Sequence, residues 1–304
     1  MTTAVVFAYH NVGVRCLKVL LAHEVHIPLV VTHADDPAEN RWFDSVAEVA
    51  ADYDLRCIAP HDANDAAVVR AVVEAQPDFL FSFYYRRMLG AELVGAPSRG
   101  ALNMHGSLLP QYRGRAPVNW AVLRGERQTG ATLHYMAGKP DAGDIVAQQA
   151  VPILPDDTAK QVFDKVTVAA EIALDAVLPA LIAGTAPRRH NDIASGSYFG
   201  GRRPEDGRID WSQSAMDVHN LVRAVAPPYP GAFTNIAGRP ARVLASRVLD
   251  QGHERQTPRL DWSGEVLRAR CGGGGTLAIR ALEVDGVPID RATFIRRFGA
   301  TVDL

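Results

Sequence analysis

The chain of 304 residues contains only three cysteines, Cys16, Cys57 and Cys271. They are odd in number and far apart in sequence, which argues against both a disulfide framework and a cysteine-based zinc site. The low cysteine content therefore predicts a protein of a reducing compartment, the cytoplasm. We expect no bound metal.

Signals for export and for membrane insertion are also lacking. No uninterrupted apolar run approaches the roughly 18 residues of a membrane helix, and the start, Met1–Phe7, has no basic segment typical of a signal peptide. The net charge of −2 leaves no basic excess of the kind that attracts nucleic acid or an anionic membrane. We expect neither a membrane nor a nucleic acid as a partner.

Two glycine motifs that bind nucleotides are absent. The turn Tyr9–Gly13 lacks Gly-x-Gly-x-x-Gly, so a nicotinamide cofactor is not expected. The glycine run 272–275 lacks the Gly-Lys-Ser/Thr of a phosphate loop and predicts a hairpin turn instead.

The first half of the chain alternates strand and helix patterns. This alternation favours an α/β fold with a Rossmann-like, mostly parallel sheet that helices cover on both faces. Asn11 is the expected N-cap of the first helix. Strands are expected at 4–9, 27–32, 55–59, 79–83 and up to Asn103, and helices at 11–23, 41–53 and 65–75.

Beyond residue 129 the pattern becomes strand–turn–strand, followed by a helix from about Thr158 to Ala183. Asp157 is its expected cap and Gly184 its stop. We therefore predict a catalytic domain at 1–185, a polar linker at 186–203 and a C-terminal domain at 204–304. The last contains a helix at 215–225, with Ser214-x-x-Asp217 as a capping box, and several short strands.

One polar segment carries the chemistry. Asn103 and His105 lie two residues apart on a short strand, so both point to the same side, and a turn leaves them at its carboxyl end, where open α/β sheets bind ligands. Together with Asp141 they supply an amide, an imidazole and a carboxylate, the three groups that are needed to transfer a one-carbon acyl group to an amine. Asn103 would stabilise the oxyanion, His105 would carry the proton, and a nearby Asp141 would raise the pKa of the imidazole.

Each piece alone has a plainer interpretation. A histidine beside a turn is usually a hydrogen-bonded structural residue, and Asp141-Ala-Gly-Asp144 fits an ordinary turn. A metal site built from His105, His134 and Asp141 would lack a recognisable local motif. Together, however, the pieces resemble a known family through the segment Asn103-x-His105-x-Ser107-Leu-Leu-Pro110-x-Tyr112-Arg-Gly114.

That segment resembles the signature of the 10-formyltetrahydrofolate-dependent formyltransferases, and the resemblance covers essentially the whole chain. It implies that Asn103 is the oxyanion stabiliser, His105 the proton-transfer residue and Asp141 the modulator of the histidine pKa. It also implies 10-formyltetrahydrofolate as co-substrate, no metal, and a small OB-like β-barrel as the C-terminal domain.

The resemblance further implies where the folate binds. One wall would be Arg87, Met88 and Leu89, although Met88 and Leu89 could equally be core residues. Arg115 corresponds to a family residue assigned to the formyl donor, but its guanidinium could equally bind phosphates of the acceptor. The other wall would be the loop Ala137, Gly138, Lys139 and Pro140.

For the acceptor, the chain is most similar to the formyltransferase half of the bifunctional polymyxin-resistance enzyme. This implies the sugar nucleotide UDP-4-amino-4-deoxy-L-arabinose, lipid A modification and antibiotic resistance. Arg113 and Arg115 could bind its diphosphate, with Tyr112 and Trp120 as stacking faces. The bifunctional enzyme continues into a decarboxylating dehydrogenase. The chain is therefore expected either to receive its amino sugar from a separate dehydrogenase or to be a fragment.

Methionyl-tRNA formyltransferase is the alternative within the family. It has a basic loop that binds tRNA, whereas the matching stretch here, His33–Arg41, has three acids and one arginine. Because nucleic-acid binding depends on cation–phosphate contacts, such a loop would repel RNA. Hydrolysis of the formyl donor and a non-catalytic folate-binding regulator remain two further alternatives.

Overall fold

The computed structural model describes residues 1–35 and 41–304, which form two compact units. Unit 1 comprises residues 1–117, 129–151 and 164–199, and unit 2 comprises 118–128, 152–163 and 200–304. Within the predicted linker, residues up to 199 therefore belong to unit 1.

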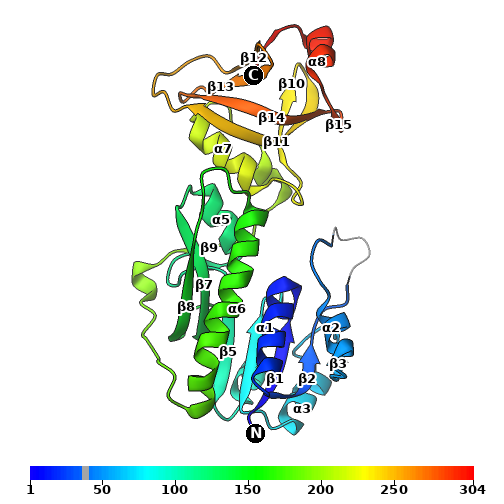
Figure 1. The fold of residues 1–304 in the computed structure, drawn as a ribbon, viewed down its shortest axis with the longest axis vertical. Helices are drawn as coiled ribbons and strands as arrows, with labels where there is room; N and C mark the ends of the chain where they lie inside the picture. The colour runs from blue at the N-terminus through cyan, green and yellow to red at the C-terminus, as the bar shows by residue number, and fades with distance from the viewer. Residues whose placement is uncertain (36–40) are drawn as a thin grey trace. The chain divides into compact units, whose positions relative to one another are not determined.

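Unit 1 is built on a sheet with the strand order β3-β2-β1-β4-β5-β7-β8 (Figure 1). The strands from β3 to β5 run parallel, and β7 pairs antiparallel with β5. The order of the parallel strands is that of a Rossmann fold, which confirms the predicted α/β architecture. The strands are β1 (Thr3–Ala8), β2 (His26–Val31), β3 (Cys57–Ile58), β4 (Phe79–Phe83), β5 (Gly100–His105), β7 (Gln128–Tyr135) and β8 (Ile145–Pro152).

The central strands are almost wholly apolar because helices cover the sheet. All five residues of β4 are buried, and Phe81 lies between the rings of Phe79 and Phe83. Such continuous apolar runs are typical of parallel strands that are covered on both faces. The helices in the N-terminal two thirds are α1 (His10–Ala22), α2 (Val46–Asp52), α3 (Ala66–Glu74), α4 (Ala91–Gly95), α5 (Pro117–Leu123) and α6 (Ala159–Ala183).

Two predicted helix starts are wrong. Helix α1 begins at His10 after Tyr9, and the Asn11 side chain instead accepts a hydrogen bond from the backbone N–H of Asp44 (2.8 Å). Helix α2 begins only at Val46, where the hydroxyl of Ser45 caps it. Helix α1 therefore has no side-chain cap, because the residue predicted to cap it bonds to Asp44 instead, whereas α2 has a cap that lies four residues beyond its predicted start.

Helix α6 is capped differently from the prediction as well. Asp157 accepts a hydrogen bond from the backbone N–H of Leu154, whereas the Thr158 hydroxyl accepts one from Gln161 (3.3 Å). Gly184 ends the helix as predicted. Its φ of 76° is the left-handed conformation that favours glycine.

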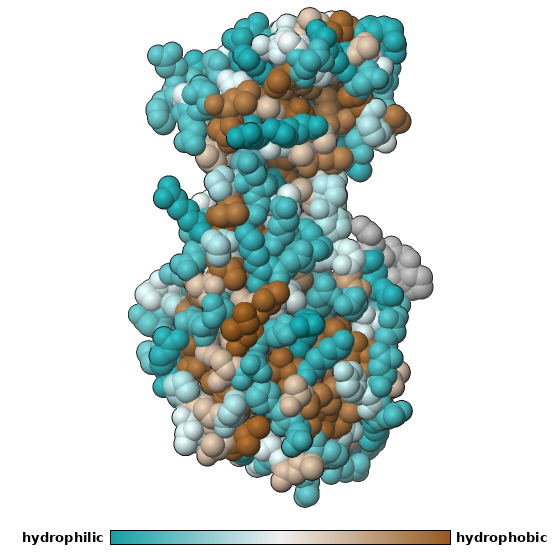
Figure 2. Space-filling model, in the orientation of Figure 1, coloured by the Kyte–Doolittle hydropathy of each residue, from teal (hydrophilic) through white to brown (hydrophobic). Residues whose placement is uncertain are grey.

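By length and composition alone, α6 is apolar enough to cross a membrane. The expectation from the sequence missed this property, because it rested only on uninterrupted apolar runs. Half of its most apolar window is buried within the protein, and core helices pass the same test. Val168 and Ile172 are exposed, and apolar surface lies among polar side chains on the face shown in Figure 2. The absence of a membrane partner stays a prediction.

Unit 2 contains an antiparallel sheet with the strand order β10-β11-β14-β13-β12-β16, and β15 pairs with β14. Among the described residues the end strands β10 and β16 do not pair with each other, so the OB-like barrel stays a prediction. The strands are β10 (Ala232–Ile236), β11 (Arg239–Asp250), β12 (Arg259–Ser263), β13 (Val266–Arg270), β14 (Thr276–Val284), β15 (Val287–Pro288) and β16 (Thr301–Asp303).

Two local predictions for unit 2 are confirmed. The hydroxyl of Ser214 caps α7 (Ala215–Ala224) by accepting a hydrogen bond from the backbone N–H of Asp217 (3.1 Å), although the Asp217 carboxylate accepts from this hydroxyl and so does not complete the predicted capping box. The glycine run 272–275 connects β13 to β14 as a hairpin. Helix α8 (Arg291–Phe298) contributes Phe294 to the apolar core of the unit.

Candidate functional site

The site is built on β5 and β7 of unit 1. Asn103 pairs with His134 across the two strands, and His105 pairs with Thr132. Because side chains two residues apart on a strand share a face, Asn103 and His105 point to the same side, as predicted. His134 and Thr132 share a face of β7 for the same reason.

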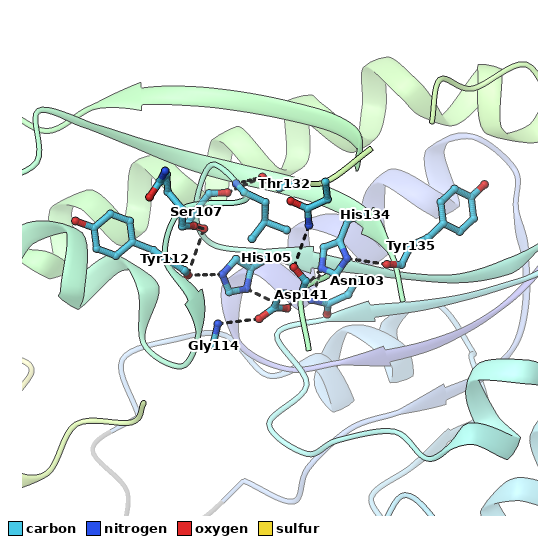
Figure 3. Close-up of polar contacts among 12 residues, drawn as sticks. Asn103, His105, Ser107, Tyr112, Gly114, Thr132, His134, Tyr135 and Asp141 are labelled. Carbon is cyan, nitrogen blue, oxygen red and sulfur yellow. Dashed lines mark hydrogen bonds and ion pairs between the residues drawn. The ribbon is translucent and has the colours of Figure 1, made fainter. Parts of the chain in front are cut away.

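The His105 imidazole is buried, and its hydrogen bonds determine its tautomer. Its Nε2 lies 2.8 Å from the backbone carbonyl oxygen of Tyr112. A carbonyl can only accept, so Nε2 carries the proton. The other ring nitrogen, Nδ1, faces Asp141 at 3.5 Å from Oδ1 (Figure 3). A neutral His105 therefore presents its unprotonated nitrogen on the side of the carboxylate.

Asp141 joins residues from three parts of the chain. Its Oδ2 accepts a hydrogen bond from the backbone N–H of Gly114 (2.9 Å), and its Oδ1 lies 3.6 Å from Nε2 of His134. Its backbone has a φ of 51°, and its carbonyl accepts a hydrogen bond from the Asn191 amide (3.0 Å). The structure thus brings together the three side chains that the sequence proposed, Asn103, His105 and Asp141.

His134 is a member of the site that the sequence interpretation considered only as a metal ligand. Its Nδ1–H donates to the carbonyl of Tyr135 (2.8 Å), and its Nε2 accepts from the Asn103 amide nitrogen (3.2 Å), because a carbonyl oxygen can only accept and an amide nitrogen can only donate. This contact orients the amide of Asn103. The alternation of Thr132 and His134 on a strand opposite Asn103 was the signal that could have identified it. Among the described residues, no group of three or more His, Cys, Asp or Glu forms a metal-binding cluster.

Burial and charge act in opposite directions on the two titratable groups. Burial raises the pKa of Asp141, but His105, His134 and the Gly114 N–H together outweigh it and lower this pKa to about 2. Burial lowers the pKa of His105, and this outweighs the upward effects of Asp141 and the Tyr112 carbonyl. Asp141 therefore raises the histidine pKa as predicted, yet the net pKa is lowered. Near pH 7 the site holds a carboxylate and a neutral imidazole.

The residues predicted to hold the folate lie in two loops. Met88 is 68% exposed and its carbonyl accepts a hydrogen bond from Asn64, while Leu89 packs partly against the core. Arg87 is exposed, so this loop presents one charged and one apolar side chain to the surface. The second loop is wholly exposed and leads directly to Asp141; it consists of Ala137, Gly138, Lys139 and Pro140.

The residues proposed to bind the acceptor differ in their exposure and in their contacts. Arg115 is exposed, whereas Arg113 is partly buried with its Nη2 3.4 Å from the carbonyl of Ile193. The Tyr112 ring stacks on Phe199, with centroids 5.1 Å apart. Arg113 and Gly114 form the short strand β6, which pairs with β9 (Tyr198–Phe199) inside the predicted linker.

In unit 2, Trp120 donates a hydrogen bond to the carbonyl of Gly200 (3.0 Å), and Arg202 lies over its ring. The acidic stretch His33–Arg41 falls mostly on residues 36–40, which lie outside the described residues. In the described part, Asp35 forms an ion pair with Arg41 (2.7 Å).

Family models match both parts of the chain. Residues 15–178 match the model described as formyl transferase, and residues 202–299 match the C-terminal domain of formyl transferase. The first match includes Asn103, His105 and Asp141, and the second includes strands β10 to β15 of unit 2.

Solved structures share the fold at low identity. An N-formyltransferase from Helicobacter canadensis, in complex with folinic acid and dTDP-3-aminofucose, is 19% identical with a TM-score of 0.72, over 92% of this chain and 99% of that one. WlaRD, a sugar 3N-formyl transferase solved with dTDP and 5-N-formyl-THF, is 18% identical with a TM-score of 0.73, over 91% and 97%. HypX from Aquifex aeolicus, in complex with tetrahydrofolic acid, is 17% identical with a TM-score of 0.62, over 97% of this chain and 47% of HypX.

Proposed function

Since the chain belongs to the formyl transferase family, we propose that it moves a formyl group from 10-formyltetrahydrofolate to the amine of a sugar nucleotide. The observation that carries this proposal is the convergence of Asn103, His105 and Asp141 at the end of β5. The similar N-formyltransferases with folinic acid and dTDP-3-aminofucose, or with dTDP and 5-N-formyl-THF, support both the donor and the acceptor class.

The chemistry follows from the positions of these groups. The amine attacks the formyl carbon, a new C–N bond forms, and negative charge develops on the formyl oxygen. The Asn103 amide, oriented by His134, donates its second N–H to this oxygen. The bond from the formyl carbon to N10 of the folate then breaks, so tetrahydrofolate leaves with a proton on that nitrogen.

His105 carries the proton between the two nitrogens. It starts neutral and accepts the proton that the attacking amine loses. The resulting imidazolium already has an acceptor on each side, because the Tyr112 carbonyl faces Nε2 and Asp141 faces Nδ1. His105 then gives the proton to the leaving nitrogen, which restores the starting state.

For the acceptor we favour UDP-4-amino-4-deoxy-L-arabinose, with Arg113 and Arg115 on or beside β6 as the candidates for diphosphate contact. A role in lipid A modification and polymyxin resistance, a cytoplasmic location and a separate dehydrogenase as supplier of the amino sugar belong to this proposal. Methionyl-tRNA is the alternative acceptor, against which the acids of His33–Arg41 and the net charge argue.

The test is a formylation assay with 10-formyltetrahydrofolate and a panel of acceptors: UDP- and dTDP-linked amino sugars and charged initiator tRNA. We expect turnover with UDP-4-amino-4-deoxy-L-arabinose and its loss in His105→Ala, with folate binding retained. Better turnover of the tRNA would refute the sugar-nucleotide proposal. Formate release without any acceptor would favour hydrolysis, and an active His105→Ala enzyme would refute the mechanism.

A further inference from the structure

The loop that follows β5 returns to the residue from which it starts. Residues 106–112 leave the strand at His105 and turn back, so that the Tyr112 carbonyl accepts the Nε2–H of His105. Tyr112 has a φ of 56°, in the left-handed region. Because that conformation costs a non-glycine residue about 1–2 kcal/mol, other contacts must hold the loop in this shape.

Thr132 supplies the main polar contacts of this loop from the opposite strand. It pairs with His105 across β5 and β7, and it is fully buried. Its hydroxyl donates to the carbonyl of Ser107 (2.6 Å) and accepts from the backbone N–H of Leu109 (3.1 Å) and from the Gln148 amide (3.0 Å). These three hydrogen bonds use the one donor and both lone pairs of a hydroxyl group.

Ser107 passes this restraint on to Tyr112. The buried Ser107 hydroxyl lies 2.6 Å from the carbonyl of Gln111, to which it donates, and 3.4 Å from that of Tyr112. An unbroken series of contacts therefore runs from Thr132 through Ser107 to the peptide group that holds His105.

We propose that Thr132 is a positioning residue whose buried hydroxyl holds loop 106–112 so that the Tyr112 carbonyl keeps the proton of His105 on Nε2. This directs Nδ1 toward Asp141, the arrangement that proton transfer requires. The inference rests on the proposed function for its catalytic meaning, but the tautomer of His105 can be measured without any substrate.

The protein offers a matched set of variants. Thr132→Val has nearly the same shape and lacks the hydroxyl, whereas Thr132→Ser keeps it. Thr129→Val is the control, because Thr129 is buried on the same strand and its hydroxyl has no hydrogen-bond partner among residues 1–35 and 41–304. If Thr132→Val does not fold, Gln148→Met removes one of the three hydrogen bonds at a less buried site.

The first readout is nitrogen NMR of histidine-labelled protein, with the His105 signals identified by their loss in His105→Ala. We expect protonated Nε2 and unprotonated Nδ1 in the wild type, Thr132→Ser and Thr129→Val. Thr132→Val should show mixed protonation of the two nitrogens and a lower His105 pKa, because the Tyr112 carbonyl raises that pKa. The titratable groups that face His105 are Asp141 and His134, and Tyr84 packs against the adjacent Gly106.

The second readout is the pH dependence of kcat. In Thr132→Val we expect kcat to fall about tenfold to a hundredfold and the acid limb of its profile to move to lower pH, while the KM for the formyl donor stays within twofold. Thr132→Ser should restore both. An unchanged tautomer, or an equal loss of kcat at every pH with an unmoved limb, would overturn the proposal. A wild type that formylates no acceptor would refute the proposed function, and the NMR result would still decide this inference.

Discussion

Replacing Asp141 by asparagine tests the electrostatic core of the site. Asn is isosteric and still offers an oxygen to the Gly114 N–H, so the change removes charge with little loss of packing. In the wild type the 3.5 Å between Nδ1 of His105 and Oδ1 of Asp141 gives, at an effective dielectric constant of about 20, about 5 kcal/mol of stabilisation for an imidazolium.

Only part of this energy appears in the rate. With about half of the proton's charge on the imidazole in the transition state, Asp141→Asn should lose about 2–3 kcal/mol of transition-state stabilisation, which corresponds to a fall in kcat of about 30- to 150-fold. The variant should also lower the pKa of His105 further, because Asp141 raises it. The acid limb of the kcat profile should therefore move to lower pH.

The assay is formylation of the amino sugar across pH 5–9, where an Asp141 with a pKa of about 2 remains ionised. Asp144→Asn is the matched control in the same turn, because Asp144 is partly exposed and lies 3.7 Å from Arg188. We expect the control to retain wild-type kcat. A kcat for Asp141→Asn within threefold of the wild type would show that the carboxylate does not stabilise the imidazolium.

Two further predictions concern stability. Phe81→Ala, in the fully buried β4, should lower the free energy of unfolding by about 3–5 kcal/mol in chemical denaturation. The control Val73→Ala, at a 52% exposed site, should change this free energy by no more than about 0.5 kcal/mol. Equal effects of the two substitutions would contradict the packing argument. Burial lowers the pKa of His219 in the folded protein; Arg223 lowers this pKa further, and the Pro155 carbonyl raises it. The folded protein should therefore lose stability as the pH falls below about 6.5, the pKa of histidine in the unfolded chain. The free-energy difference between wild type and His219→Gln should shrink from pH 7 to pH 5, and a constant difference would refute this assignment.

The parts of the site that sequence predicts are those set by local periodicity. The apolar run of β4 and the two-residue spacing of Asn103 and His105 each follow from the geometry of a single strand. The Ser214 cap of α7 is equally local. These features need no knowledge of which distant segment packs beside them, and the structure confirms them.

The parts that sequence misses depend on contacts between distant segments. Strands β6 and β9 have two residues each and pair across more than 80 positions, so neither has a periodic signal. The orientation of the Asn103 amide depends on which ring nitrogen of His134 bonds to Tyr135. The lowered pKa of His105 likewise follows from burial, which only the assembled fold determines.

The opposition between burial and charge at His105 suits a group that must accept a proton and then release it. Burial alone would keep the imidazole neutral, but no negative charge would then stabilise the positive charge of its protonated form. The carboxylate alone would keep the imidazole protonated before the amine arrives. Since burial has the larger effect, His105 begins neutral; since Asp141 and the Tyr112 carbonyl are already in place, the imidazolium needs little rearrangement once it forms. The same argument explains why Asp141 must remain ionised, because a protonated carboxyl group would remove the only negative charge that faces Nδ1 among the described residues.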